Sequence, residues 1–107
     1  MFAYNITFVV DAHKEKELLH YINDELRPKL FNNESPAQTP ELKKVIETAG
    51  EKPGPDHALS IALSAVFETE EKAHLWNDHF LIPALGDFHK YFGEHALFFV
   101  TLLQILY

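Results

Sequence analysis

The sequence has no cysteine and few basic side chains. Because none of its 107 residues is Cys, disulfides, thiolate metal sites and a cysteine nucleophile are excluded. Nine Lys and Arg stand against sixteen Asp and Glu, which gives a formal net charge of −7. This balance argues against nucleic acid as a partner, since phosphate binding needs clustered basic side chains. The reactive groups that remain are histidines, carboxylates and hydroxyls.

Long hydrophobic segments are also missing. The longest apolar run, 96–103, is interrupted by Thr101 and is too short to span a bilayer. Residues 1–10 contain no basic region and no small-residue cleavage site, and their apolar and polar side chains alternate as in a strand. We therefore expect a cytoplasmic protein without membrane contact, folded as a single domain over 1–107.

Alternating and helical patterns divide the chain into regular elements. Strands are predicted over 2–10, 57–67 and 96–106. Helices are expected after Asp11 and after Thr69, both of which are residue types that favour the N-cap position. Their apolar stripes comprise Leu18, Leu19, Ile22, Leu26 and Leu30 in the first helix, and Ala73, Trp76, Phe80, Ala84, Phe88 and Tyr91 or Phe92 in the second.

Two prolines and one glycine mark expected interruptions of these helices. Pro28 has no N–H and disfavours helical geometry at the preceding residue, so the first helix should kink or end there. Pro83 is expected to kink the second helix. Gly93 is well placed to terminate it.

The segment 41–48 is ambiguous. Thr39 followed by Pro40 is typical of an N-cap and a first helical position, and the apolar residues that follow have helical spacing. The alternative is a short strand with residues 42, 44, 46 and 48 on one face. The local signals favour the helix slightly.

The order of elements is typical of a ferredoxin-like split βαβ domain, of the α+β class. Two helices would then cover one face of an antiparallel sheet. The last strand is apolar on both of its faces, although the helices can cover only one of them. We therefore expect a homodimer formed through the sheet face and the last strand, as in a dimeric α+β barrel.

One group of residues with helical spacing could bind a metal ion. His13, Glu17, His20 and Asp24 could share one helix face, and imidazoles with carboxylates are ligands for zinc, nickel or iron. This face lies opposite the apolar stripe and also carries Lys16. A solvated surface is therefore the favoured interpretation, and we expect neither a metal nor a cofactor.

His79 and His74 are weak candidates for a general acid or base near Trp76 and Tyr4. His74 with Asp78 has the spacing of an ordinary surface pair, and a surface position is the favoured interpretation of both histidines. The catalytic alternative is a cofactor-free dimeric α+β barrel enzyme, acting on a small apolar or aromatic molecule in a helix–sheet cleft. It requires a buried histidine beside a tyrosine or an asparagine.

Small polar residues of two strands form a possible ligand-binding floor. Asn5, Thr7, Ser60 and Ser64 occupy the smaller-residue faces of strands that are neighbours in a ferredoxin-like sheet. Such a floor, near Trp76 in the sequence-derived arrangement, could bind a small molecule inside a dimer cavity. The favoured interpretation is that small side chains let two sheets approach closely.

Several short motifs along the chain carry a resemblance to a known family. They are 4–7, 27–30, 40–46, 60–67, Trp76 and 101–106. In their order and spacing the chain resembles the bacterial family Domain of Unknown Function 4286. The resemblance implies a ferredoxin-like sheet and places 42–48 as its second strand, which we adopt in place of the helix. It implies no catalytic residue, because the family has no established activity.

Together these observations predict a homodimeric ligand-binding or interaction domain without catalytic activity. The enzyme described above is the alternative. A small-molecule ligand is compatible with the first interpretation and is required by the second.

Overall fold

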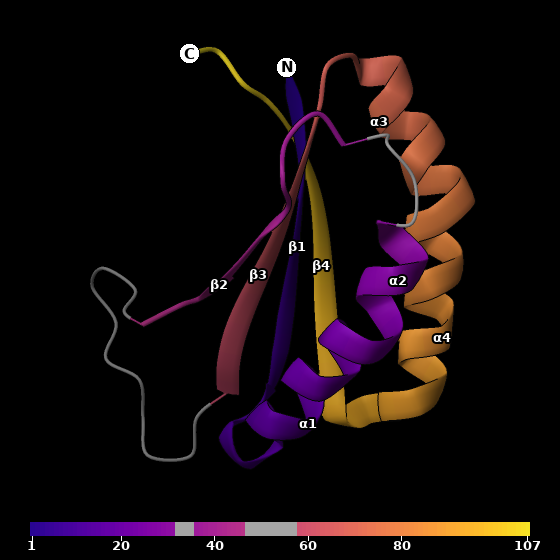
Figure 1. Ribbon diagram of the computed structural model, residues 1–107. Coiled ribbons are helices and arrows are strands. Elements are labelled where there is room, and N and C mark those ends of the chain that lie inside the picture. The colour runs from indigo at the N-terminus through magenta and orange to yellow at the C-terminus, as the bar shows by residue number, and fades with distance from the viewer. Residues whose placement is uncertain (32–35, 47–57) are drawn as a thin grey trace.

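The computed structural model describes residues 1–31, 36–46 and 58–107 and shows one antiparallel sheet with helices on one side (Figure 1). The strands are β1 (Phe2–Asp11), β2 (Glu41–Lys44), β3 (Ala58–Phe67) and β4 (Ala96–Gln104). Their order in the sheet is β2-β3-β1-β4, and each neighbouring pair is antiparallel. This arrangement confirms the α+β, ferredoxin-like fold that the order of elements predicts.

Two long helical segments form the second layer. The first comprises α1 (Glu15–Tyr21), a π turn (Ile22–Leu26) and α2 (Arg27–Leu30), and the second comprises α3 (Glu70–Trp76), a π turn (Asn77–Leu81) and α4 (Ile82–Phe92). Short 3-10 turns occupy Ala12–Lys14 and Gly93–His95. No helix within 1–31, 36–46 or 58–107 is long and apolar enough to cross a membrane.

The second strand corrects the local helix preference. Residues Glu41–Lys44 pair with β3, and the Val45 N–H donates to the Ser60 carbonyl at 2.9 Å. Pairing with β3 satisfies these backbone groups between strands, and this tertiary contact outweighs the weak local helix signal. The strand inferred from the family resemblance is therefore right for 42–44, whereas residues 45 and 46 follow the end of β2. Residues 47 and 48 and the expected strand start at His57 lie outside the described residues.

Both prolines lie inside continuous helical segments. The Arg27 N–H donates to the Ile22 carbonyl, and the Ile82 N–H donates to the Asn77 carbonyl, five residues back in each case. This π register widens the turn just before Pro28 or Pro83, where an α-helical bond to the proline nitrogen is impossible. The first helix is predicted to kink or end near Pro28, and the structure has the π turn directly before this residue and the end of the helix at Leu30, two residues after it.

The π turn also displaces the apolar stripe of the second helix. A spacing of four residues after Trp76 predicts Phe80 in the core, but Leu81 is fully buried and Phe80 only partly so. Leu85 is buried as well, and Phe92 takes the inward position that Tyr91 could have occupied. The extra residue in the widened turn brings Leu81 inward in place of Phe80, which simple helical periodicity does not include, while the predicted Ala84 and Phe88 are buried as expected.

The helix ends follow their sequence signals in two of three cases. Thr69 Oγ1 accepts a hydrogen bond from the Lys72 N–H at 3.1 Å, as expected of an N-cap. Gly93 ends α4 with φ 59°, a conformation that favours glycine. Asp11 stands at the expected N-cap position, but its side chain makes no capping hydrogen bond.

The core lies between the sheet and the helices. Alternate residues of β1 and β3 face the helices, and the stripe of the first helix packs on them. Its fully buried members include Ile6, Phe8, Leu18, Leu26, Leu30, Ile61, Phe67, Trp76, Leu81 and Phe88. One face of the sheet is thereby closed, and the other is left without helices.

Candidate functional site

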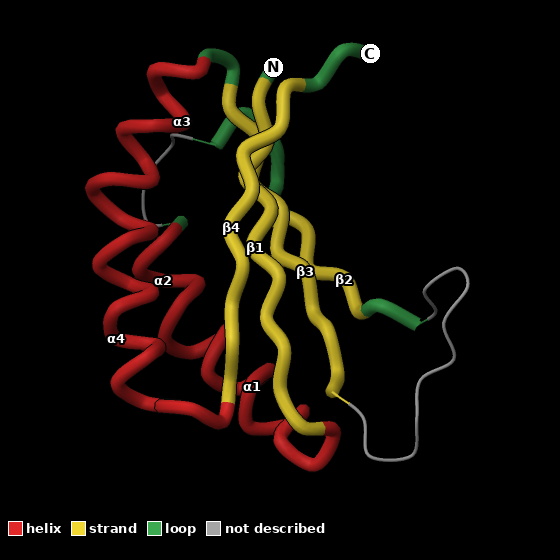
Figure 2. The backbone as a smooth tube through the Cα atoms, turned by 180° about the vertical axis from the view of Figure 1, so that it is seen from behind, coloured by secondary structure: helices red, strands yellow, loops and turns green. Residues whose placement is uncertain are grey.

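The sheet face opposite the helices is the candidate functional site (Figure 2). We call it the open face. Strand alternation and register assign to it Ala3, Asn5, Thr7, Val9 and Asp11 of β1, Ala58, Ser60, Ala62, Ser64 and Val66 of β3, Leu97, Phe99, Thr101 and Leu103 of β4, and Glu41 and Lys43 of β2. It combines a polar centre with an apolar margin.

The polar centre is a row that crosses the whole sheet. In register, Glu41 lies opposite Ser64, Ser64 opposite Asn5, and Asn5 opposite Thr101. The Asn5 Nδ2 donates a hydrogen bond to Thr7 Oγ1 at 3.1 Å. The structure thus places Asn5, Thr7, Ser60 and Ser64 on one face, as the strand patterns require.

Glu41 and Thr101 belong to the same row, but the sequence did not single them out. Thr101 lies in an otherwise apolar strand, and Glu41 in a segment whose local signals favour a helix. Only the register of β2 and β4 with the central strands identifies them. To find these two residues from the sequence, one would need to know that 41–44 is a strand and which residues it and β4 pair with.

The apolar margin of the open face lies on the edge strand β4. Leu97, Phe99 and Leu103 point away from the helices, and their exposed fractions are 56%, 59% and 49%. Soluble monomers rarely expose contiguous apolar surface of this kind unless it binds something. The last strand, which the sequence shows to be apolar on both faces, therefore exposes one of these faces at the edge of the sheet.

The open face carries few charges. Its charged described residues are Asp11, Glu41 and Lys43, and the last two form an ion pair with 3.0 Å between Oε2 and Nζ. The chain as a whole has a formal charge of −7. Most of the acidic side chains that the structure describes lie away from this face.

The six histidines that the structure describes do not form a buried catalytic group. Within the described chain, every histidine is exposed: His13, His20, His74, His79, His89 and His95. His74 Nε2 lies 3.4 Å from Glu70 Oε1 on the outer side of α3. The arrangement that the enzyme hypothesis requires, His74 or His79 buried beside Tyr4, is therefore wrong for these two residues, because their positions on the helix face solvent.

Tyr4 and Trp76 are core residues. Their ring centroids lie 5.8 Å apart, and the Trp76 indole Nε1 donates to the Leu30 carbonyl at 2.8 Å. Burial raises the pKa of Tyr4, and the nearby negative charges of Asp78 and Glu70 raise it further. Trp76 is 1% exposed, so it joins the two helical segments and does not line the polar floor proposed for it.

The suspected metal cluster is divided into surface pairs. His20 Nε2 lies 2.8 Å from Asp24 Oδ2, and Glu17 pairs with Lys14 at 3.5 Å. No group of three His, Asp or Glu side chains in the described part of the chain is arranged to hold a metal ion. Exposed pairs of this kind contribute little to stability.

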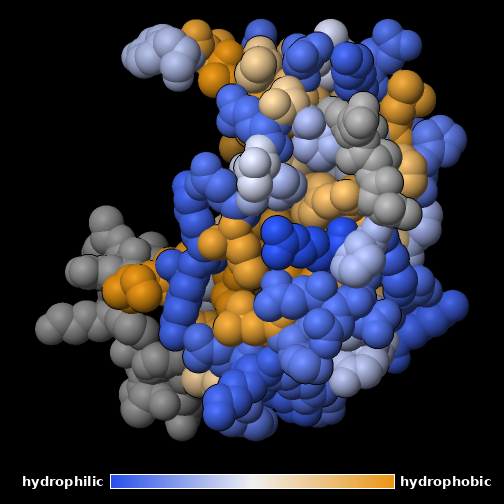
Figure 3. Space-filling model, viewed as in Figure 1, coloured by the Kyte–Doolittle hydropathy of each residue, from blue (hydrophilic) through white to orange (hydrophobic). Residues whose placement is uncertain are grey.

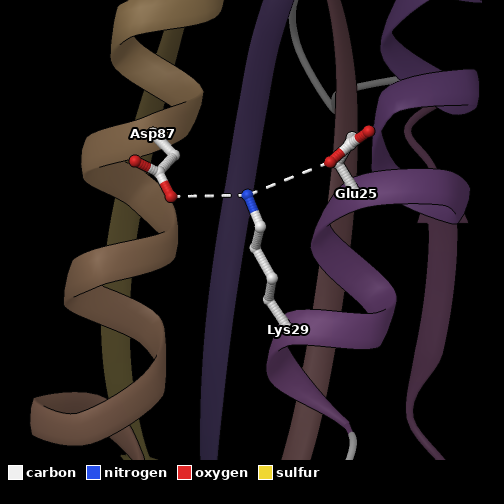
Figure 4. Close-up of polar contacts among 3 residues, drawn as sticks. All are labelled: Glu25, Lys29 and Asp87. Carbon is white, nitrogen blue, oxygen red and sulfur yellow. Dashed lines mark hydrogen bonds and ion pairs between the residues drawn. The ribbon is translucent and has the colours of Figure 1, made fainter.

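A second polar cluster links the two helical segments. Lys29 Nζ lies between Asp87 Oδ2, at 3.3 Å, and Glu25 Oε2, at 4.0 Å (Figure 4). All three side chains are substantially exposed. The cluster connects α2 with α4 across the surface, and its exposure suits a weak structural contact.

Comparisons with known proteins identify the family and support the fold. The family described as "Domain of unknown function (DUF4286)" matches residues 1–106, and the chain belongs to this family. No curated protein matches the sequence.

Two solved structures are similar in fold. The de novo designed protein Foldit4 has a TM-score of 0.55 at 11% identity, over 97% of each chain. A protein from Thermus thermophilus described as a putative PII-like signaling protein has a TM-score of 0.44 at 15% identity, over 98% of this chain and 90% of its own. The first likeness concerns the fold alone.

Proposed function

We propose that this member of the DUF4286 family is a non-catalytic interaction domain that pairs with a second copy of itself through the open face. One observation carries the proposal. The edge strand β4 exposes Leu97, Phe99 and Leu103 on the side that the helices do not cover. Edge strands of stable monomers are usually protected by charges, bulges or a covering element, so β4 requires a partner.

The charge of the open face favours a second copy over an oppositely charged partner. Glu41 and Lys43 compensate each other within one chain, and Asp11 at the end of β1 is the one other charged residue of the described open face. A basic protein would be attracted to the more acidic parts of the molecule, whereas a sparsely charged, apolar face best fits another sparsely charged, apolar face. The open face of a second copy meets this requirement.

Two open faces can stack about a twofold axis that is parallel to the plane of the sheet and perpendicular to its strands. In this arrangement β4 lies over the partner's β4, and the apolar margins of the two copies meet. With the axis between the rows of Asn5 and Thr7, Glu41 lies over the partner's Lys43. An axis along the strands would instead place the apolar margin over the charged β2, so the first arrangement is favoured.

The size of the open face is sufficient for a dimer interface. Strands β1, β3 and β4 have nine or ten residues each, so their flat projection is roughly 30 Å by 15 Å at about 3.3 Å per residue and 4.8 Å between strands. The relief of the side chains enlarges this area toward the roughly 800 Å² per partner of a standard interface. The exposed apolar residues 105–107 extend the same edge.

The small polar side chains then lie at the centre of the interface. Asn5, Thr7, Ser60 and Ser64 have little bulk, and we favour their role in letting the two sheets approach to about 10 Å. A small-molecule ligand between the sheets is the finer alternative for the same residues. The histidine-dependent enzyme is not favoured, because each described histidine is exposed.

A pair of leucine variants tests the dimer. Leu103 lies on the open face and Leu75 on the outer side of α3, and each is 49% exposed. Leu103→Glu is expected to raise the dimer dissociation constant at least about 100-fold, since a twofold interface buries the new carboxylate twice. Leu75→Glu should leave it unchanged.

Sedimentation equilibrium over a dilution series provides the measurement, and circular dichroism confirms that both variants fold. A wild-type protein that is monomeric at every concentration would overturn the proposal. So would equal weakening by Leu103→Glu and Leu75→Glu.

A further inference from the structure

A pocket on the helix side of the sheet is separate from the open face. It lies between the first helical segment and β2 and has a volume of about 100 Å³. Its walls are the apolar Ile22, Phe31, Leu42 and Leu63, with Asn23 and Arg27 as polar neighbours. Figure 3 shows apolar surface at the bottom of a hollow on this side, bordered by hydrophilic residues.

The pocket exists because β2 is short and lies outside the area that the helices cover. Leu42 and Leu63 are register partners, and both face the helix side of the sheet. Leu63 is buried, whereas Leu42 at the edge is 38% exposed. The apolar floor therefore continues from the core into a depression that is accessible from outside.

The π turn gives the pocket a polar side. Arg27 N–H donates to the Ile22 carbonyl, and Pro28 has no N–H to donate. Within the described helix, the Asn23 carbonyl therefore lacks both the α-type donor at residue 27 and the π-type donor at residue 28. Widened turns of this kind frequently accompany functional sites.

Arg27 gives the pocket a charge preference. It is the only arginine in a chain of net charge −7, and it lines the pocket with Asn23. A guanidinium presents a fork of donors that matches a carboxylate in a bidentate arrangement. The single arginine is thus placed beside an apolar depression, which suits a ligand with one anionic end and one apolar end.

The volume limits the apolar end. A cavity of about 150 Å³ lined by Leu, Ile and Phe holds benzene. A pocket of about 100 Å³ therefore suits a smaller group, such as a branched aliphatic chain of three to five carbons.

We propose that this pocket binds a small branched-chain aliphatic carboxylate. The carboxylate contacts Arg27, and the branched tail lies between Leu42 and Phe31 above Leu63. Binding needs no second copy of the chain, because the lining residues belong to one protomer and lie on the side opposite the open face.

The test uses 3-methylbutanoate and its neutral analogue 3-methylbutanamide. Titrations are followed by amide chemical shifts of the full chain in two-dimensional NMR. We expect 3-methylbutanoate to shift resonances of the residues around the pocket, and the amide to bind at least about tenfold more weakly, since a charge-assisted contact is lost. Phe31 stacks on Trp76 at 5.9 Å, so the fluorescence of this sole tryptophan gives a second readout.

Two matched pairs of variants locate the site. Arg27→Met should weaken binding of 3-methylbutanoate about tenfold or more, whereas Lys16→Met removes the same charge from the same helical segment away from the pocket and should leave it unchanged. Leu42→Glu places a carboxylate in the pocket and should abolish binding, while Val45→Glu on the same side of the chain as the open face should preserve it.

Four results would overturn the proposal: no shift with 3-methylbutanoate up to its solubility limit, equal affinity for the amide, equal loss in Arg27→Met and Lys16→Met, or shifts confined to other surfaces. Circular dichroism establishes that each variant folds. Leu103→Glu, which is expected to weaken the dimer, should bind 3-methylbutanoate as the wild type does. The failure of the pocket proposal can therefore be distinguished from the failure of the dimer proposal.

Discussion

The two faces of one sheet differ most clearly at two adjacent residues of β4. Phe98 faces the helices, where its ring lies 6.0 Å from that of Phe88 in an edge-to-face arrangement. Phe99 faces away from them and is 59% exposed. The same strand therefore supplies one aromatic ring to the core beneath the helices and another to a surface that the described elements leave exposed.

This difference shows which part of the fold is self-sufficient. The covered face is closed by two helical segments whose stripes match it. The open face has small polar residues at its centre and apolar ones at one edge, and no element within 1–31, 36–46 or 58–107 covers it. Folding stability should therefore depend on the first face and association on the second.

The largest expected effect concerns the covered face. Phe8 is fully buried and its ring lies 5.0 Å from that of Phe88. Phe8→Ala should lower the free energy of unfolding by roughly 3–5 kcal/mol, because it removes apolar contacts and leaves a cavity. Thr7→Ala, the next residue along β1 but on the open face, should change it by less than about 1 kcal/mol.

Urea denaturation at a low, fixed protein concentration measures both changes. Comparable losses in Phe8→Ala and Thr7→Ala would contradict the assignment of the two faces to different roles.

The next effect separates the adjacent aromatic residues directly. Phe98→Ala should destabilise the dilute protein by roughly 1–3 kcal/mol, since a partly buried ring is lost. Phe99→Ala should change stability by no more than about 0.5 kcal/mol under the same conditions. At higher protein concentration the wild type should gain stability that Phe99→Ala lacks, because association stabilises the folded state by mass action.

Thermal unfolding at several concentrations provides the measurement. A concentration dependence that is the same in wild type and Phe99→Ala would show that this ring is not part of an association surface.

The smallest effect depends on pH and concerns Tyr4 in the covered core. Its pKa is raised above the usual 10.0 by burial and by Asp78 and Glu70, so the folded state holds the phenolic proton where the unfolded chain loses it. The contribution to stability is complete below pH 10 and is lost as pH rises from about 10 through the folded-state pKa. Tyr4→Phe should change stability at pH 7 by no more than about 1 kcal/mol and should flatten the decline above pH 10.

Denaturation curves between pH 7 and pH 11 measure this slope. Burial also raises the pKa of Tyr21, so Tyr21→Phe should flatten the decline in the same direction. A slope that neither variant changes would contradict the burial of these hydroxyl groups as the cause.

Much of the fold can be predicted from local patterns. Alternation identifies β1 and β3 and assigns their residues to faces, an apolar run indicates β4, and Thr69 and Gly93 mark the ends of the second helical segment. Segment 41–44 is a strand against its local preference, because four residues gain more from pairing with β3 than from a weak helix signal. Leu81 replaces Phe80 in the core because a π turn breaks the periodicity.

The candidate sites are less predictable than the fold. Sequence spacing suggests His74 and His79 as reactive groups, but spacing does not show whether a helix position faces the core or solvent. Arg27 and Leu42 are fifteen positions apart, and nothing in their sequence context indicates that they line one pocket. Their meeting requires the helix to pack on the sheet and β2 to pair with β3.

The sequence by itself determined the chemical limits and the alternation: no thiol chemistry, an acidic balance, strands with one core face, and a last strand that is apolar on both sides. These properties depend on residue identity and near-neighbour spacing, which the linear chain contains. The tertiary structure decided that β4 lies at an edge, that the polar row spans four strands, and that Arg27 stands beside an apolar depression. Each of these results depends on contacts between distant segments, and the free energy of such contacts exists only once the chain has folded.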